Sequence, residues 1–214
     1  MQEKQFIPAF NYDFLTPLYD FFLNLLGFGY KERKKIVGLL KLKNNEKLLD
    51  IGCGTGSLII VSKKLHPQNE IVGIDIDDRI IRIARNKIEN ENLDIELIKA
   101  GAEKLPFPNS SFDVVVSSLV FHHLPLEIKK LAIKEVTRVL KNKGRFLLVD
   151  FGTADKFWMK TIYPLEKLFG IREAETIKDN LDGKLPILLR ELGLQVKEVR
   201  QKYKGIEYLL ATRL

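Results

Sequence analysis

Short apolar runs alternate with amphipathic stretches along the chain between residues 47 and 150. The apolar runs have the length of strands and end at charged or glycine-rich turns. They are residues 47–51, 70–75, 95–99, 112–117 and 145–150. The unbroken Val114-Val115-Val116 run is typical of a strand that is buried on both faces. Because strands that alternate with helices connect by right-handed crossovers, this pattern predicts a parallel sheet with helices on both faces.

The intervening stretches repeat their apolar residues at helical spacing. A first helix is predicted over residues 57–65, and a second begins at a cap that Asp77 or Asp78 supplies. A third helix is predicted over residues 126–140, closed by the segment 142–144. The apolar stripe predicted to face the sheet from this third helix is Ile128, Leu131, Ala132, Val136 and Val139.

The N-terminal end of the chain departs from this alternation. Residues 1–44 look helical and hold an unusual density of aromatic residues, many of them within residues 6–30. An apolar segment that precedes an α/β core suits a cover over a ligand site. We therefore expect residues 1–44 to form a helical lid and residues 45–214 to form the core, within a single domain overall.

The C-terminal end predicts an irregular helix over residues 151–169, interrupted by Pro164, and then a short helix over residues 185–192. Two β runs follow, residues 194–202 and 206–212. The turn between them is too short for a crossover, so the two strands must pair antiparallel. The sheet is thus predicted to end in a hairpin.

Composition narrows the class of protein. With 214 residues, 45% of them hydrophobic and 29% charged, the chain is ordinary for a globular domain. Cys53 is the single cysteine and the N-terminal residues do not resemble a signal peptide, so a reducing, cytoplasmic setting is expected. The net charge of +7 is spread over helices and turns and forms no dense basic run with aromatics. That distribution argues against nucleic acid and leaves peripheral contact with an anionic membrane open.

A glycine-rich turn follows the first predicted strand, in the segment Asp50-Ile-Gly-Cys-Gly-Thr-Gly56. Dinucleotide-binding folds share such turns, but here the last glycine comes one position early for their spacing. A carboxylate at Asp50 would also repel a pyrophosphate, whereas it would attract the ammonium and sulfonium groups of S-adenosylmethionine (SAM). Asp75 ends the second strand at the distance expected of a ribose-binding carboxylate, although a helix-capping role is the alternative.

Five segments, taken in order, resemble the motifs of class I SAM-dependent methyltransferases. They most resemble the subgroup that contains the ubiquinone and menaquinone biosynthesis C-methyltransferases. The resemblance covers about residues 46–150, and it implies a Rossmann-like seven-stranded sheet of order 3-2-1-4-5-7-6 with strand 7 antiparallel. The segments are Asp50-Ile-Gly-Cys-Gly-Thr-Gly56, Gly73-Ile-Asp75, Ala102-Glu-Lys-Leu-Pro-Phe-Pro-Asn-Ser-Ser-Phe-Asp113, Phe121-His-His-Leu124 and Arg138-Val-Leu-Lys-Asn-Lys-Gly-Arg-Phe146.

The resemblance also implies the contacts of SAM. The glycine turn and its carboxylate would hold the methionine end, Asp75 the ribose and Ile76 the adenine, with Ser117 beside the transferred methyl group. Gly101 stands where many relatives have an aspartate that bonds the adenine, so Ala102 or Glu103 is expected to supply that contact. The cofactor-binding set is therefore Asp50, Gly52, Cys53, Gly54, Thr55, Gly56, Asp75, Ile76, Ala102, Glu103 and Ser117.

Methyl transfer from a sulfonium needs alignment, exclusion of water and sometimes the removal of a proton, but no metal and no covalent nucleophile. His122 and His123 follow the fourth strand, at the sheet edge where ligands bind, and either is a candidate general base. The alternative is that both pack the loop. Nothing in the sequence chooses between the two histidines.

The sequence thus predicts a SAM-dependent methyltransferase that acts on a small, hydrophobic or aromatic acceptor, with a demethylquinone as one candidate. Two alternatives remain at this point. The first is a SAM-binding module without catalysis, which the glycine at position 101 favours. The second is an NAD-dependent dehydrogenase built on a related sheet. The oligomeric state is not predicted.

Overall fold

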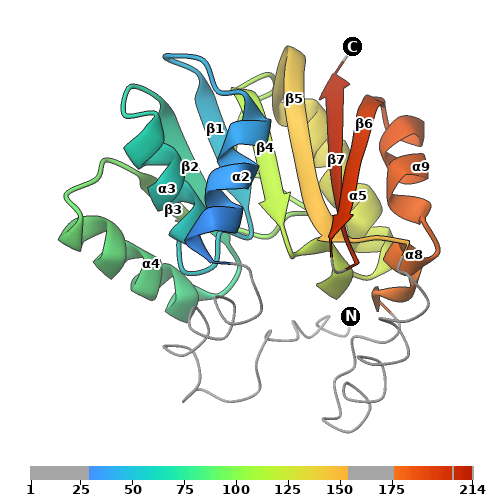
Figure 1. Cartoon of the computed structure of the whole chain (residues 1–214), viewed down its shortest axis with the longest axis horizontal. Coiled ribbons are helices and arrows are strands. Elements are labelled where there is room, and N and C mark those ends of the chain that lie inside the picture. The colour runs from blue at the N-terminus through green and yellow to red at the C-terminus, as the bar shows by residue number, and fades with distance from the viewer. Residues whose placement is uncertain (1–28, 154–175, 204, 214) are drawn as a thin grey trace, which may run out of the picture.

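The chain folds around a seven-stranded sheet of order β3-β2-β1-β4-β5-β7-β6. The computed structural model describes residues 29–153, 176–203 and 205–213 (Figure 1). The strands are β1 (Lys47–Ile51), β2 (Glu70–Asp75), β3 (Glu96–Lys99), β4 (Phe112–Ser118), β5 (Leu140–Phe151), β6 (Leu194–Tyr203) and β7 (Ile206–Arg213).

Strands β1 to β5 pair in parallel, and β7 runs antiparallel to both β5 and β6. The hairpin predicted at the C-terminus is therefore confirmed, and so is the order 3-2-1-4-5-7-6 with strand 7 antiparallel. The order of the strands in the sheet reverses at β1, which pairs with β2 on one side and with β4 on the other. Such a switch point is where open α/β sheets bind their ligands, outside the carboxyl ends of the strands.

Alternate residues along each central strand enter separate hydrophobic clusters on opposite faces of the sheet. In β4, Val115 belongs to one cluster, whereas Val114 and Val116 belong to the other. In β1, Leu49 and Leu48 divide in the same way. Because side chains on a strand alternate between faces, a continuous apolar run supplies both clusters at once. This explains why β4 has no polar face.

Helices cover both faces (Figure 1). The cluster with Val114 contains apolar residues of α2 (Tyr30–Leu40), α3 (Ser57–Leu65) and α4 (Asp78–Asn90). The cluster with Val115 contains residues of α5 (Leu126–Val139) and α9 (Lys184–Glu191). A single 3-10 turn, η1 (Phe121–His123), follows β4, and the short helix α8 (Lys178–Leu181) precedes α9. The predicted helix over residues 57–65 is confirmed without change of bounds.

Two expectations about α5 and β5 were wrong. Leu131 is 43% exposed, and the buried stripe of α5 instead includes Lys129 and Ile133. Lys129 is buried because α8 packs near it, with the Lys129 ammonium donating to the carbonyl of Thr176. Strand β5 begins at Leu140, which pairs with Phe112, and the segment 142–144 lies within the strand, in the register irregularity that precedes the Arg145–Val114 pair.

The aromatic N-terminal segment within residues 1–28 and most of the irregular helix expected over residues 151–169 lie outside the described residues. The helix α2, which ends the expected lid segment, packs against α3. Within the part of the chain that the structure describes, no helix has the length and apolarity needed to cross a membrane.

Candidate functional site

The glycine-rich turn after β1 closes on the end of β2 at the carboxyl edge of the sheet. The backbone N–H groups of Gly52 and Cys53 both donate to the carbonyl of Ile74, at 2.8 and 2.9 Å. Gly52 has a φ of 72°, and a Cβ added there would lie 2.3 Å from the side chain of Val120. Glycine is required at this position both for its left-handed backbone and for the close approach of the loop that follows β4.

Cys53 fills space within this turn. Its side chain is 7% exposed, and a Cβ added to Gly73 of β2 would lie 2.9 Å from its sulfur. Burial, with the carboxylates of Asp50 and Asp75 nearby, raises the pKa of the Cys53 thiol well above its usual value. The thiol therefore stays protonated and serves as a small apolar filler.

Asp50, in β1, is the most unusual polar group of the edge. Its side chain is 2% exposed, and its Oδ1 atom has no hydrogen-bond partner among the residues described here. Burial raises the pKa of Asp50 to about 8, with a further contribution from the negative charge of Asp75. A buried carboxyl without a partner costs free energy unless a ligand supplies the missing donor or cation. Asp50 is thus arranged to receive a positively charged group.

Asp75 stands at the end of β2 and braces the glycine turn. Its Oδ2 accepts from the N–H of Gly54 at 2.9 Å, and its Oδ1 accepts from the N–H of Asp77 at 3.0 Å. Burial raises the pKa of Asp75 despite these bonds. Asp77 caps α4 by accepting from the N–H of Arg79 at 2.8 Å. The helix cap is therefore supplied by Asp77, and Asp75 keeps its remaining lone pairs toward the edge.

The loop after β3 carries the residues expected near an adenine. Ala102 is buried, whereas Ile76, after β2, is 40% exposed. A Cβ added to Gly101 would lie 2.5 and 2.6 Å from the carboxylate oxygens of Glu103. The Glu103 carboxylate thus lies over Gly101, in the space that an aspartate side chain at position 101 would enter.

Two further residues of the expected set are held by neighbours. The Ser117 hydroxyl, fully buried in β4, donates to the carbonyl of Ile51 at 2.9 Å and so ties the ends of β4 and β1 together. The hydroxyls of Thr55 and Ser57 lie 3.2 Å apart within the turn. Both residues shape the edge on which Asp50 and Asp75 lie.

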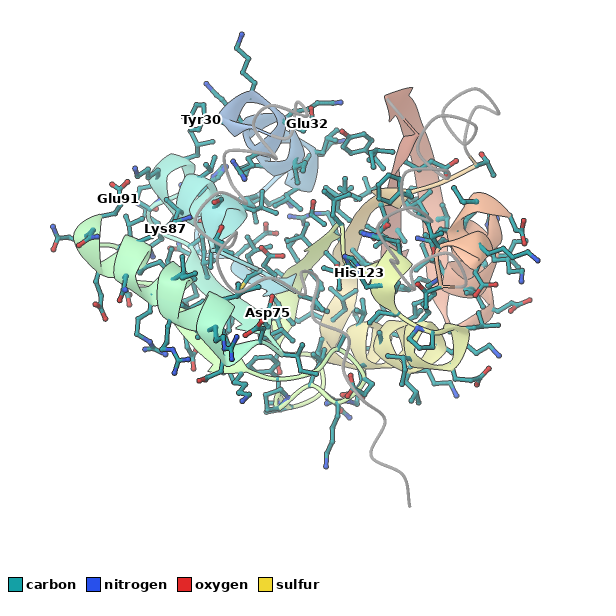
Figure 2. The ribbon with its side chains drawn as sticks, turned by 90° about the horizontal axis from the view of Figure 1, so that it is seen from below. Tyr30, Glu32, Asp75, Lys87, Glu91 and His123 are labelled. Carbon is teal, nitrogen blue, oxygen red and sulfur yellow. The ribbon has the colours of Figure 1, made fainter. Side chains whose placement is uncertain are left out.

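The two histidines of η1 differ in their surroundings. His122 is 5% exposed, and its Nδ1 lies 2.9 Å from Oδ1 of Asp150, at the end of β5. His123 is partly exposed and stacks on His122 with ring centroids 3.9 Å apart. In Figure 2, which shows the molecule from below the edge, Asp75 and His123 lie toward the middle of the molecule, whereas Tyr30 and Glu91 lie at its periphery.

Asp150 is the site residue that sequence reasoning missed. It is 2% exposed, although it is a charged residue at the end of a buried strand. That position was the available signal, because Asp75 ends β2 in the same way. Its partners were not visible in the sequence, since His122 lies 28 residues earlier and Asn180 lies 30 residues later.

The edge suits SAM as a ligand. The unpartnered Oδ1 of Asp50 requires a cation or a donor, which the ammonium group of SAM supplies. The turn between Gly52 and Gly56 lets a ligand approach the backbone closely, and Asp75 offers a second carboxylate for hydroxyl groups. A pyrophosphate offers no cation to stabilise the ionised form of Asp50, which argues against a dinucleotide.

Comparison with known proteins also indicates a methyltransferase. Residues 48–144 match the methyltransferase domain family. Over 151 residues, 70% of this chain and 68% of the relative, the sequence is 33% identical to the demethylmenaquinone methyltransferase of Thermus thermophilus. It is 31% identical to that of Thermotoga maritima over 164 residues, 72% of this chain and 69% of the relative.

A solved structure shares the architecture as well. A SAM-dependent methyltransferase from Methanosarcina mazei matches 84% of this chain and 97% of its own, with 26% identity and a TM-score of 0.65. The sheet order with its antiparallel β7, the glycine turn and the similarity to relatives over two thirds of their length agree with one another. The chain belongs to the class I SAM-dependent methyltransferases and is a SAM-dependent methyltransferase that acts on a small molecule.

Proposed function

We propose that this methyltransferase transfers the methyl group of SAM to a ring carbon of a demethylated quinol with an apolar side chain. The observation that carries the cofactor part is the buried carboxylate of Asp50 beside the glycine turn, whose Oδ1 atom has no hydrogen-bond partner within the described part of the chain. SAM supplies a methyl group on a positively charged sulfur, which is already an activated leaving group. The protein therefore needs to align the acceptor, exclude water and accept a proton.

Different residues at the edge bind different parts of the cofactor. Asp50 pairs with the ammonium group of the methionine part, and the backbone from Gly52 to Gly56 lies along that part. Asp75 accepts hydrogen bonds from the ribose hydroxyls while it also holds the N–H of Gly54. Ser117 lies beside the methyl group and fixes the spacing of β1 and β4 through its bond to Ile51.

Glu103 takes the place of the aspartate that position 101 lacks. The carboxylate of Glu103 lies over Gly101, so it reaches the region of the adenine from two residues further along the loop. Ala102 and Ile76 supply apolar contact to the adenine ring. The glycine at position 101 is therefore compatible with SAM binding, and the reading as a module without catalysis loses its main support.

The acceptor follows from similarity and from chemistry. The relatives from Thermus thermophilus and Thermotoga maritima are named for demethylmenaquinone, an aromatic acceptor with a long apolar tail. A molecule of that kind resides in a membrane, and the net charge of +7 favours contact with an anionic membrane surface. A demethylated naphthoquinol is thus the acceptor that the residues and the relatives favour together.

The test follows labelled methyl groups. The purified protein receives SAM with a labelled methyl group, together with a lipid extract from a host that lacks the quinone methyltransferase. The label is expected in the quinone fraction of the extract, and only after the quinones are reduced. Label that appears solely on water-soluble aromatic acceptors would rule out the quinol as the substrate.

A further inference from the structure

We infer that Asp150 positions His122 as the general base of the reaction, so that Nε2 of His122 takes the proton that the acceptor loses. The inference rests on the proposed function, since a base is needed for an acceptor that gives up a proton. It selects His122 over His123 and adds Asp150, which acts through His122 rather than on the substrate. Asp150 is thus a positioning residue.

Asp150 is held by several hydrogen-bond donors at once. Its Oδ2 accepts from the N–H groups of Val120 and Phe121, at 3.0 and 2.7 Å. Its Oδ1 accepts from the N–H of Phe151 at 2.7 Å and from the side-chain amide of Asn180 at 3.2 Å, beside Nδ1 of His122. A buried carboxylate with this many donors cannot rotate, so its direction toward His122 is fixed.

The charge of Asp150 determines which nitrogen of His122 carries hydrogen. Burial alone would favour the neutral acid, but His122 and the N–H of Phe151 lower the pKa of Asp150 below its usual value. An ionised carboxylate has no hydrogen to donate, so Nδ1 of His122 must be the donor of the 2.9 Å bond. In the neutral ring, Nε2 then has a free lone pair, as a general base requires.

The position of the ring suits that task. His122 follows Val120 by two residues, and Val120 packs against Gly52 of the cofactor turn. The ring of His122 also contacts the tilted ring of His123, and it packs nearly perpendicular to the ring of Phe151, whose centroid lies 4.8 Å away. His122 is the more deeply buried of the two histidines, since His123 is partly exposed, and it is His122 whose Nδ1 lies 2.9 Å from Oδ1 of Asp150.

Other charged groups near the pair come from α5 and α8. Lys129 of α5 is fully buried and acts on Asp150 through its charge. Its ammonium lies 3.9 Å from Asp179 of α8, which also pairs with Lys184 at 2.7 Å. Lys129 therefore stabilises the ionised form of Asp150 without a direct bond. With His123, these groups make up the charged surroundings of the pair in the described structure.

The proton balance of the step is simple. Nε2 of His122 takes the hydrogen of a quinol hydroxyl as a proton, and the ring carbon ortho to that oxygen bonds to the methyl group. The carbon–sulfur bond breaks, and its electron pair stays on sulfur, which becomes neutral. The hydrogen on the methylated carbon returns to the oxygen through water. One proton leaves by way of His122, and no oxidant or reductant takes part.

The test combines kinetics with nitrogen NMR on the full chain. The chain has three histidines, so the ring nitrogens of a protein labelled at histidine can be assigned by substitution. We expect His122 to show hydrogen on Nδ1, and Asp150→Asn to move it toward Nε2. With a reduced, short-chain demethylmenaquinone analogue, His122→Gln and Asp150→Asn should lower kcat by roughly 10²- to 10⁴-fold. The KM for SAM should not change.

His66→Gln is the matched control, since His66 ends α3 away from the carboxyl edge. It should keep the wild-type kcat and leave the signals of His122 in place. Wild-type turnover in His122→Gln, or hydrogen on Nε2 of His122 in the unaltered protein, would overturn the inference. A wild-type protein that binds SAM but leaves the quinol unmethylated would instead overturn the proposed acceptor and the base with it, while the nitrogen signals would still report on the pairing with Asp150.

Discussion

At the scale of single residues, Asp50 sets how the protein responds to pH. Burial raises its pKa to about 8 in the protein without ligand, whereas the ordinary value is 3.8. A cation binds to the ionised form, so binding must release the proton whenever the pH lies below about 8. The affinity for SAM is therefore expected to fall by about tenfold for each pH unit below that value.

Calorimetry in buffers with different heats of protonation measures this release. We expect about one proton per SAM bound at pH 7, and Asp50→Asn should bind SAM weakly with no proton release. An affinity that stays flat between pH 6 and pH 8 would contradict the assignment of Asp50.

The raised pKa of Asp50 also has a consequence for folding stability. Because the folded protein holds this proton up to higher pH than the unfolded chain, the contribution of Asp50 to stability without ligand is largest below its ordinary pKa of 3.8 and is lost as the pH rises toward 8.

How far single residues could be predicted depended on the range of their contacts. Asp50 and Asp75 could be predicted as cofactor-binding residues because both belong to one strand–turn–strand unit with a recognisable glycine spacing. Asp150 was missed because its meaning comes from His122, 28 residues away, and from Asn180. Lys129 was missed for the same reason, since only the packing of α8 buries it. Patterns along the chain report neighbours in sequence and do not report such pairs.

At the scale of elements, the glycine turn after β1 and the loop after β4 form one unit. A Cβ on Gly52 would collide with Val120, and the φ of 72° is unfavourable for any other residue. Gly52→Ala is therefore expected to lower the free energy of unfolding by roughly 2–4 kcal/mol. Urea denaturation measures that loss, and SAM affinity should fall with it because the turn must shift.

Gly54→Ala separates the cost of the left-handed backbone from the cost of the contact with Val120. Gly54 has a φ of 55°, but no atom lies within 4 Å of a Cβ placed there. The loss of stability at Gly54 should thus be about 1 kcal/mol, from the backbone alone. When Val120→Ala is added to Gly52→Ala, the additional loss of stability at Gly52 should be recovered, because the collision with the Val120 side chain is removed. Equal losses at the two glycines would show that the contact with Val120 is unimportant.

Element boundaries were predicted well where the chain is regular and less well where tertiary contacts intervene. The bounds of β1, β2 and α3 match the apolar runs because a residue that interrupts the pattern follows each run: Gly52 after β1, Asp77 after β2 and Pro67 after α3. Strand β5 was predicted to begin at Arg145, but Leu140 already pairs with Phe112. The segment 142–144 has the residues of a turn, and in the structure it forms the irregular part of β5 between the pairs that Leu140 and Arg145 make with β4.

At the scale of the whole molecule, the faces of the sheet provide stability and its carboxyl edge carries the candidate site. Its faces bury apolar residues under helices, so stability comes from the clusters on either side. Its carboxyl edge gathers Asp50, Asp75, His122 and Asp150. The topology was predictable because alternation and a short hairpin turn admit few arrangements. The acceptor was not predictable in this way, because a pattern of strands does not encode the shape of a small molecule.

The charge of the whole chain leads to a last prediction, about how an apolar quinol reaches that edge. A net charge of +7 attracts the chain to an anionic surface, by about 1 kcal/mol for each basic residue near it. We expect the protein to sediment with vesicles of anionic lipid at about 0.05 M salt and to be released at about 0.5 M salt, because screening shortens the range of the attraction. Neutral vesicles are the control and should bind little. Binding that is equal on both kinds of vesicle, or that persists at high salt, would indicate insertion of apolar residues instead, since a purely electrostatic contact must weaken as the screening length falls.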